Sequence, residues 1–204
     1  MGQRTMENKT ILITGAGGYL GSNLTNHLST NNIIHSYSGD VRSYKPYNNL
    51  DIVIHFASPS DDYEFADTHK TVTTIIDGSL NMLKLASIND AKFVFASTMG
   101  VHNTNIADTY CACKLAVEKY IMFTYNKYMI LRVPRVYSKC RKKGLMRKLR
   151  EKNVPDADML KVVEYLPLQE FIDQTLAVLD TTKTIYEYCN LRQRTLKDIE
   201  RCYV

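Results

Sequence analysis

The sequence predicts an α/β fold built on a doubly wound parallel sheet, followed by a small C-terminal part. Short apolar runs rich in β-branched residues alternate with longer segments in which apolar residues recur at helical spacing. This alternation is typical of a parallel sheet that helices cover on both faces. A glycine-rich stretch at residues 14–21 separates the first apolar run from the first helical segment. In α/β proteins such a stretch is the expected turn from strand to helix.

The predicted elements follow one another from residue 9 to residue 134. The first strand is the run KTILITG at residues 9–15, and the first helix lies in the segment YLGSNLTNHLST that follows the glycines. Further strands are expected at residues 32–41 (as one strand or two short ones), 50–58, 91–98 and 128–134. Further helices are expected at residues 71–87 and 109–125.

The pattern weakens after Pro134. A basic helix, a turn at Pro155 and helices at residues 168–180 and 195–202 are expected there. We therefore divide the chain into a core of residues 1–138 and a reduced part of residues 139–204. We expect the helix at 168–180 to pack back on the core.

Composition places the chain among ordinary globular proteins. Its 204 residues are 45% hydrophobic, which suits one compact domain with at most a small appendage. No apolar run approaches the length needed to cross a bilayer. The N-terminal segment MGQRTMENKT lacks the apolar stretch of a signal peptide. These features predict a soluble, cytoplasmic protein without a membrane-spanning segment.

Charge and cysteine usage narrow the range of ligands. Much of the net charge of +5 lies in KCRKKGLMRKLREK, residues 139–152, which is typical of a solvated helix face but could also meet phosphate. The run has no interleaved aromatic residues, which argues against nucleic acid. The five cysteines are an odd number, and Cys111 and Cys113 form C-x-C without a nearby cluster of ligands. We expect free thiols and no metal site.

The glycine stretch TGAGGYLG is the strongest functional signal. Gly15, Gly18 and Gly21 have G-x-x-G-x-x-G spacing between a predicted strand and a predicted helix. Gly15 would allow a tight turn, Gly18 a close approach of the backbone to a pyrophosphate, and Gly21 close packing of helix and strand. The free N–H groups of the helix N-terminus would then bind the anion. The context favours dinucleotide binding over a purely structural turn.

Five segments in the expected order resemble the extended short-chain dehydrogenase/reductase family, of the NAD-dependent epimerase/dehydratase type. They are GDVR (39–42), DIVIHFAS (51–58), FASTMGVH (95–102), YCACK (110–114) and LRVPRVYS (131–138). The likeness extends over nearly the whole chain, which would be a shortened member. The resemblance implies a Rossmann-like fold, a cofactor that is NAD, with NADP also compatible, and a nucleotide-sugar as substrate.

The resemblance also assigns roles to residues. It implies three catalytic residues: Thr98, Tyr110 and Lys114. The implied cofactor-binding residues are Gly15, Gly18, Tyr19, Leu20, Gly21, Asp40, Val41, Phe56, Ala57, Ser58 and Lys114. The implied substrate-binding residues are Ser58, Met99 and Arg135, and Arg141 in the basic run could hold a diphosphate. Ser97, His55 and His102 are interpreted as packing or surface residues.

The spacing of Tyr110 and Lys114 suits proton transfer, because residues four apart share one face of a helix. A phenol is too weak an acid to act as a base near neutrality. We expect the Lys114 ammonium and the positive nicotinamide ring to lower the pKa of Tyr110. Thr98 would hold the substrate oxygen by a hydrogen bond. Taken alone, the pair could equally be a helix start and a surface lysine.

Departures from the family pattern refine these expectations. The second strand of relatives ends in an acid that holds the adenosine ribose, but here that strand and its loop look deleted or merged. Either Asp40 would take a double role or recognition of the ribose would be weak. Arg42, Ser36 and Ser38 could tolerate a 2′-phosphate. Only residues 99–109 separate Thr98 from Tyr110, which indicates a trimmed loop. Met99 and Gly100 stand where 4,6-dehydratases carry Asp-Glu, which disfavours dehydration.

Three hypotheses remain. The first is an enzyme that acts on a nucleotide-sugar as epimerase or 4-keto reductase. The second is a catalytically idle dinucleotide-binding protein, a sensor or assembly partner. The third is a nucleic-acid binder that uses residues 139–152, with an affinity that falls steeply with salt. The resemblance also implies a homodimer formed through the helices at 71–87 and 109–125.

Overall fold

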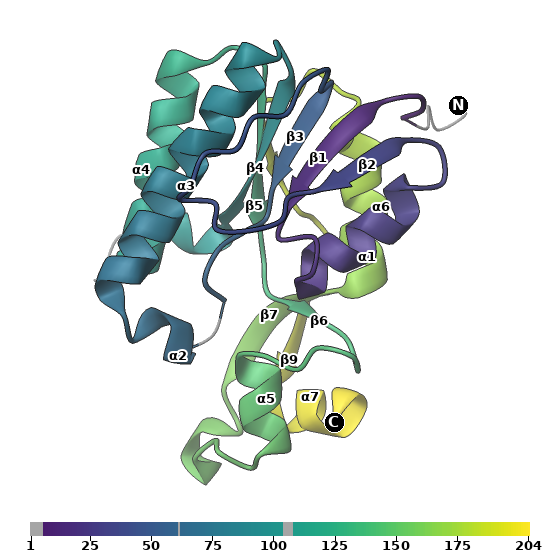
Figure 1. The fold of residues 1–204 in the computed structure, drawn as a ribbon. Coiled ribbons are helices and arrows are strands. Elements are labelled where there is room, and N and C mark those ends of the chain that lie inside the picture. The colour runs from purple at the N-terminus through teal and green to yellow at the C-terminus, as the bar shows by residue number, and fades with distance from the viewer. Residues whose placement is uncertain (1–5, 61, 104–107) are drawn as a thin grey trace.

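The computed structural model describes residues 6–60, 62–103 and 108–204, and its main body is a parallel sheet between two layers of helices (Figure 1). In these residues six strands pair in the order β2-β1-β3-β4-β5-β8. Their bounds are β1 Thr10–Thr14, β2 Ile33–Ser36, β3 Ile52–His55, β4 Lys92–Thr98, β5 Tyr128–Val133 and β8 Ile185–Glu187. All five pairings within this sheet are parallel. The predicted Rossmann-like α/β class is confirmed.

The sheet is buried on both faces. Helices α1 (Tyr19–Leu28) and α6 (Leu168–Leu179) pack on one face, where Ile11 and Ile13 point. Helices α3 (Thr68–Ile88) and α4 (Thr109–Thr124) pack side by side on the other, where Leu12 points. Because successive residues of a strand face opposite sides, the continuous run ILI fills both layers. The helix expected at 168–180 therefore lies against the sheet.

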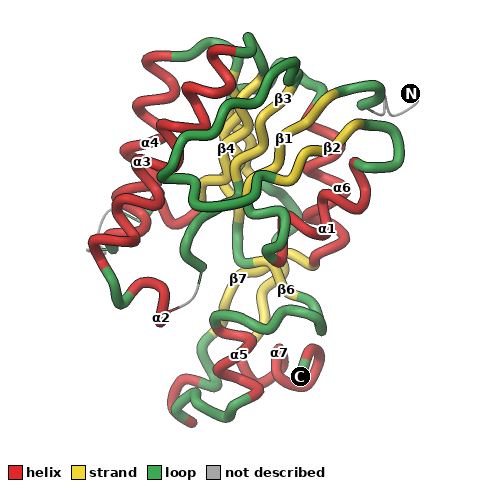
Figure 2. The backbone as a smooth tube through the Cα atoms, viewed as in Figure 1, coloured by secondary structure: helices red, strands yellow, loops and turns green. Residues whose placement is uncertain are grey.

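The second strand expected within residues 32–41 is present as β2, so the deletion suggested by the departure from the family pattern did not occur. β2 is a four-residue edge strand, and in the described residues no further strand lies beyond it. Compared with the doubly wound order 3-2-1-4-5-6, the sheet of the described residues lacks the outermost strand at this edge, and β8 is the last strand at the other edge. A helix-free segment, residues 37–49, leads from β2 to β3 along α3 (Figure 2). Tyr37 and Val41 anchor this segment in the core.

The C-terminal part carries a small sheet that the sequence pattern did not reveal. Its strands pair in the order β6-β7-β9, with bounds β6 Val136–Tyr137, β7 Val162–Pro167 and β9 Arg192–Thr195. Helices α5 (Leu145–Arg150) and α7 (Leu196–Tyr203) cover it, and the 3₁₀ turn η2 (Asp156–Asp158) follows the basic helix. The core of this part is a cluster of Tyr137, Met146, Leu149, Tyr165, Leu196 and Ile199.

The chain passes between the two parts more than once. After β7 it returns to the main body through α6 and β8, and it then re-enters the small sheet through β9. The small sheet therefore lies beyond the carboxyl ends of the parallel strands (Figure 1). Open α/β sheets bind their ligands outside this edge, at the point where the strand order reverses. Here that point lies between β1 and β3.

The two remaining helical segments, α2 (Asp62–Phe65) and the 3₁₀ turn η1 (Met99–His102), also lie near that edge. The polar N-terminal residues 1–5 and part of the short loop between Thr98 and Tyr110 fall outside the described residues. Among the helices that are described, none combines the length and apolar character of a membrane span.

Candidate active site at the carboxyl edge of the sheet

The glycine turn joins the end of β1 to the start of α1. Gly15 has a φ of +69°, a left-handed conformation that favours glycine, and a Cβ there would lie 2.8 Å from the Ala57 nitrogen. The Gly18 N–H donates to the Gly15 carbonyl at 2.8 Å, which closes the turn. Gly18 is the N-cap residue of α1, and no side chain caps that end among the described residues. The first amides of α1 are thus left for an anion.

The two outer glycines of the motif are sterically required. A Cβ on Gly21 would lie 2.2 Å from the Gly15 carbonyl oxygen, so the absence of a side chain lets α1 close on the turn. By contrast, a Cβ on Gly17 would meet no atom within 4 Å. The turn is thus tightly packed on its inner side and open at Gly17. This cradle fits a pyrophosphate.

The segment after β3 forms the opposite wall. The Ala57 N–H donates to Thr14 Oγ1 at 3.1 Å, which binds this wall to the end of β1. The Phe56 ring packs edge-on against Phe171 of α6, with 6.3 Å between centroids. The Ser58 hydroxyl is buried, and among the described residues it has no hydrogen-bond partner of normal geometry. A buried hydroxyl that lies beside the Tyr110 phenol at this edge suits a ligand-binding role.

His55, the last residue of β3, contacts both the end of β1 and helix α3 through its ring nitrogens. Its Nδ1 lies 2.6 Å from Thr14 Oγ1, and its Nε2 lies 3.1 Å from Ser79 Oγ of α3. Complete burial lowers the pKa of His55 to about 3, with a smaller contribution from the Lys114 charge. The interpretation of His55 as a packing residue omitted these hydrogen bonds.

This buried imidazole predicts loss of stability in mild acid. The folded pKa of His55 is about 3, below the ordinary value of 6.5, so the unfolded chain takes up the proton first as the pH falls. We expect the free energy of unfolding to fall by up to about 1.4 kcal/mol per pH unit between pH 6.5 and 4.5. Urea titrations at both pH values should show this loss in the wild type and a smaller one in His55→Gln. An equal loss in both proteins would contradict the assignment.

Tyr110 and Lys114 come from the first turns of α4. The Asp108 carboxylate caps this helix by accepting from the Tyr110 N–H at 2.9 Å. Lys114 is 2% exposed, and its ammonium donates to the Ala96 carbonyl at 2.7 Å. The same nitrogen lies 5.6 Å from the centre of the Tyr110 ring. Phe65 of α2 packs beside Tyr110, with 5.4 Å between ring centres.

Thr98 ends β4 and begins the turn η1. Its Oγ1 accepts from the Gly100 N–H at 3.1 Å, and the side chain is only partly buried. Ser97 is 3% exposed, and its hydroxyl has no partner among the described residues. Met99 follows at the start of η1 and is half-buried. β4 thus delivers Thr98 to the same edge as the Lys114 contact with Ala96.

The electrostatics of the chain alone correct one expectation. Burial raises the pKa of Tyr110 to about 12, and the nearby Ser58 hydroxyl and Arg141 charge offset only part of that rise. Burial also lowers the pKa of Lys114 to about 7, which the Glu118 charge partly counteracts. In the protein without cofactor, the pKa of Tyr110 is therefore not lowered as expected. Desolvation of the buried phenol raises this pKa by more than the neighbouring groups lower it.

The two basic residues expected to bind substrate, Arg135 and Arg141, have different contacts. The Arg141 guanidinium lies over the Tyr19 ring, 5.0 Å from its centre, and the Tyr19 hydroxyl donates to Ser138 Oγ at 2.8 Å. Leu20, next in α1, packs against the core. Arg135 is exposed, and its positive charge, like that of Arg141, offsets part of the rise that burial causes in the pKa of Tyr137. Arg141 thus lies beside Tyr19, the first residue of α1 after the glycine turn.

Asp40 and Val41 lie farther along the same edge. The Asp40 carboxylate accepts from Arg42 Nε at 2.9 Å and from its Nη2 at 2.5 Å, and these bonds lower the pKa of Asp40 to about 2. Val41 is buried against Gly78 of α3, where a Cβ would lie 2.6 Å from Val41 Cγ2. The segment is therefore ordered, but its acid is already paired with Arg42.

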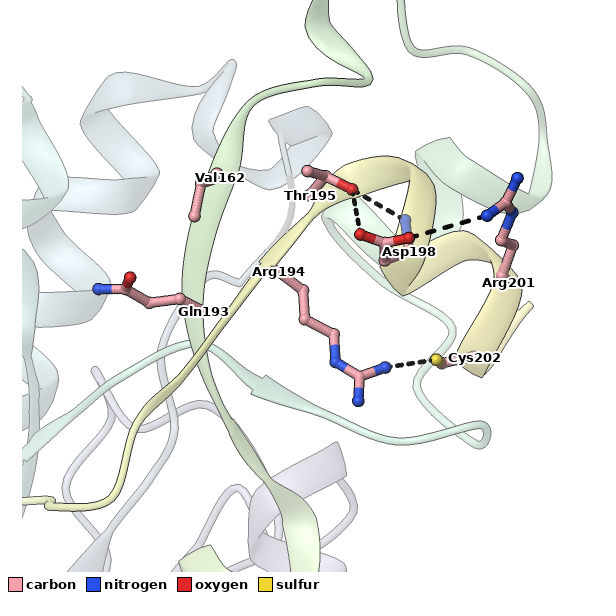
Figure 3. Close-up of a pocket in the computed structure, with 7 residues that line it drawn as sticks. All are labelled: Val162, Gln193, Arg194, Thr195, Asp198, Arg201 and Cys202. Atoms are coloured by element: carbon pink, nitrogen blue, oxygen red, sulfur yellow. Dashed lines mark hydrogen bonds and ion pairs between the residues drawn. The ribbon is translucent and has the colours of Figure 1, made fainter.

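A pocket lies away from these residues, in the C-terminal part. It has a volume of about 530 Å³ and lies between β9 and α7 of the small sheet (Figure 3). Its lining consists of Val162, Gln193, Arg194, Thr195, Asp198, Arg201 and Cys202. None of these is a predicted site residue, and their polar groups largely pair with one another: Thr195 Oγ1 donates to Asp198 at 2.6 Å.

Within the described residues, no group of three or more His, Cys, Asp or Glu could hold a metal.

Comparisons with known proteins agree with the geometry. The model of the NAD dependent epimerase/dehydratase family matches residues 11–158. No curated protein sequence matches the chain. Among solved structures, dTDP-4-dehydrorhamnose reductase from Bacillus anthracis in complex with NADP has a TM-score of 0.78 at 18% identity, over 96% of this chain and 80% of that one.

Two further structures have similar scores. UDP-glucose 4-epimerase from Thermus thermophilus in complex with NAD has a TM-score of 0.76 at 18% identity, over 94% of this chain and 81% of that one. An epimerase from Methanothermobacter thermautotrophicus has a TM-score of 0.80 at 15% identity, over 96% of this chain and 76% of that one. At such identities these likenesses establish the fold alone.

Proposed function

The chain belongs to the NAD-dependent epimerase/dehydratase family, and we propose that it is an NAD(P)-dependent oxidoreductase or isomerase acting on a nucleotide-sugar. The observation that carries the proposal is the shared location of Thr98, Tyr110 and Lys114. Lys114 of α4 is hydrogen-bonded to Ala96 of β4, two residues before Thr98, and its ammonium lies near the Tyr110 ring. The glycine turn with its uncapped helix N-terminus ends at the same edge of the sheet.

The cofactor is NAD, with NADP as the variant that some solved relatives contain. The turn at Gly15 and Gly18 would hold its pyrophosphate, because the first amides of α1 have no capping side chain there. Asp40 and Val41 would flank the adenosine end, and Ala57 and Ser58 the inner wall. β2 ends in Ser36 rather than an acid, which is compatible with a 2′-phosphate. When bound, the cofactor supplies a hydride acceptor and donor.

The residues of the chain move the proton. With a pKa near 12, the Tyr110 phenol carries its proton at neutral pH and can donate it to a carbonyl oxygen during reduction. In the reverse direction the phenolate takes the proton of the sugar hydroxyl, and a charged Lys114 favours that anion. Thr98 Oγ1 would hold the same substrate oxygen. Together with the hydride that the cofactor would supply, these proton transfers account for reduction of a keto group or for epimerisation through one.

The reaction type follows from what surrounds Thr98. Met99 and Gly100 offer no acid or base next to it, so epimerisation or 4-keto reduction is favoured over dehydration. Arg141, beside Tyr19 and within electrostatic reach of Tyr110, would bind a phosphate of the nucleotide. The short C-terminal part leaves the base of the nucleotide with few partners. We therefore expect modest discrimination between UDP-, GDP- and dTDP-sugars.

The function is tested by supplying cofactor and substrate together. The protein is incubated with NAD(H) or NADP(H) and a panel of UDP-, GDP- and dTDP-sugars. Nicotinamide absorbance reports net reduction, and NMR of the sugar reports epimerisation without net redox change. Turnover of at least one sugar is expected.

The alternative is an idle dinucleotide-binding protein, for which the raised pKa of Tyr110 and the lowered pKa of Lys114 are the supporting observations. Cofactor binding without turnover of any sugar would favour it.

We further propose a homodimer through α3 and α4. These helices lie side by side on one face, and α4 exposes Tyr120, Met122 and Phe123, the last 94% exposed. Apolar side chains gathered on one helix suit burial against a second copy. Light scattering at micromolar concentration should give twice the mass of the chain, and Phe123→Glu should shift it to the monomer. A monomeric wild type would contradict this assembly.

A further inference from the structure

Glu118 is a fully buried carboxylate with one dominant partner. It lies on α4, one helical turn after Lys114, and its side chain is 0% exposed. Arg132 of β5 donates to it through Nη2 at 2.7 Å and through Nε to both oxygens at 3.2 Å. This fork is the geometry in which arginine binds a carboxylate most strongly.

The pair extends outward to two other segments. Arg132 Nη1 donates to Glu187 of β8 at 2.8 Å, and Glu187 also pairs with His102 of η1 at 2.7 Å. The inner carboxylate is buried, whereas Glu187 and His102 are about half exposed. A buried ion pair is weak evidence for stability, because the cost of desolvation cancels much of the attraction. The position of Glu118 gives it another role.

Glu118 and Lys114 share one face of α4 and reach neighbouring strands. Residues four apart on a helix lie on one face, and both side chains are buried between α4 and the sheet. Lys114 contacts the carbonyl of Ala96 on β4, and Glu118 contacts Arg132 on β5, which pairs in register with Ser97. The two contacts are therefore one residue apart along β4.

We propose that Glu118, clamped by Arg132, is the positioning residue for Lys114: it fixes the helix face from which the Lys114 ammonium reaches the Ala96 carbonyl, and it places a carboxylate one helical turn from that ammonium. This inference rests on the proposed function, in which the positive charge of Lys114 stabilises the phenolate of Tyr110. Glu118 touches neither substrate nor cofactor and acts only through Lys114.

The charges around Lys114 support this assignment. Burial lowers the pKa of Lys114, and Glu118 is the largest influence that raises it, ahead of Cys113 of the same helix. Facing Lys114 from β3 is His55, which its own lowered pKa keeps neutral near pH 7. Tyr110 on α4 is also neutral there because its pKa is raised. Arg132 on β5 is the cation that holds Glu118.

The test is the titration of Lys114 in the free protein, followed by NMR of lysine labelled with ¹³C at Cε and assigned with Lys114→Met. Glu118→Gln keeps the shape of the side chain and removes its charge. We expect the midpoint of Lys114 to fall by about one pH unit. Glu187→Gln, which removes the exposed partner of the same Arg132, is the matched control and should leave the midpoint unchanged. A folded Glu118→Gln with an unshifted midpoint, or an equal shift in Glu187→Gln, overturns the proposal.

A second variant covers a failure of Glu118→Gln to fold. Glu118→Gln with Arg132→Met removes both charges, so no unpaired charge is left buried. A smaller downward shift is expected, because Arg132→Met also removes the cation that partly cancels the field of Glu118 at Lys114. A folded double variant without any shift, or one that cannot fold, would show a purely structural pair. The readout needs neither cofactor nor substrate. Failure of the proposed function would instead appear as absence of turnover with Lys114 titrating as predicted.

Discussion

Tyr110→Phe is expected to lower turnover by about 10³-fold, with a range of roughly 10²–10⁴ for loss of one acid–base group. The substitution removes one oxygen and keeps the ring, which packs on Phe65 and faces the Lys114 ammonium. Proton transfer to the substrate oxygen is lost, but the glycine turn is untouched. Turnover is measured on the nucleotide-sugar that the wild type accepts, and cofactor affinity by nicotinamide fluorescence. The affinity should change by less than about threefold.

The same helix offers a matched control. Tyr120 lies on the same helix α4, is half exposed, and is about 15 Å farther along the helix axis than Tyr110. Tyr120→Phe makes the identical chemical change and should leave turnover within about twofold of the wild type. If Tyr110→Phe keeps wild-type turnover, or both variants lose it alike, the phenol of Tyr110 is not the proton-transfer group.

The main sheet could be predicted because its signal is local. Strands such as β1 and β3 are buried on both faces, so they appear as continuous apolar runs, and the long helices α3 and α4 show clear helical spacing. The small sheet had no such signal. β6 has two residues, and Val162 at the start of β7 is 61% exposed, so neither gives a run of buried positions.

The candidate site could also be predicted only in part from the sequence. Spacing alone predicts that Tyr110 and Lys114 share a helix face, but it does not say how far that face is buried. Docking of α4 on β4 and β5 leaves Lys114 2% exposed, and this desolvation lowers the pKa of the lysine and raises that of the tyrosine. The ion pair of Glu118 with Arg132 was missed for the same reason, because its partners are brought together only by helix–sheet packing.

Gly21→Ala should weaken cofactor binding by at least about 100-fold. The new Cβ would lie 2.2 Å from the Gly15 oxygen, 2.8 Å from the Gly15 carbonyl carbon and 3.1 Å from Ala16 Cα. All three are backbone atoms, so no side-chain rotation relieves the clash and the turn itself must move. Overpacking of this kind costs about 1–3 kcal/mol of stability. It also displaces the amides that would bind the pyrophosphate. Fluorescence titration with NADH and NADPH measures the affinity, and thermal unfolding measures the stability.

Gly17→Ala is the control within the same turn, because its Cβ would meet nothing within 4 Å and its φ lies outside the left-handed region. The variant should fold as well as the wild type, since alanine restricts the unfolded chain by roughly 0.4–1 kcal/mol, and its cofactor affinity should stay within about threefold. The contrast separates two explanations of the motif. If the turn binds the cofactor, affinity falls in Gly21→Ala out of proportion to its lost stability. If the glycines serve packing alone, Gly21→Ala unfolds at a lower temperature, yet at 10 °C, where it is still folded, it binds NADH as the wild type does.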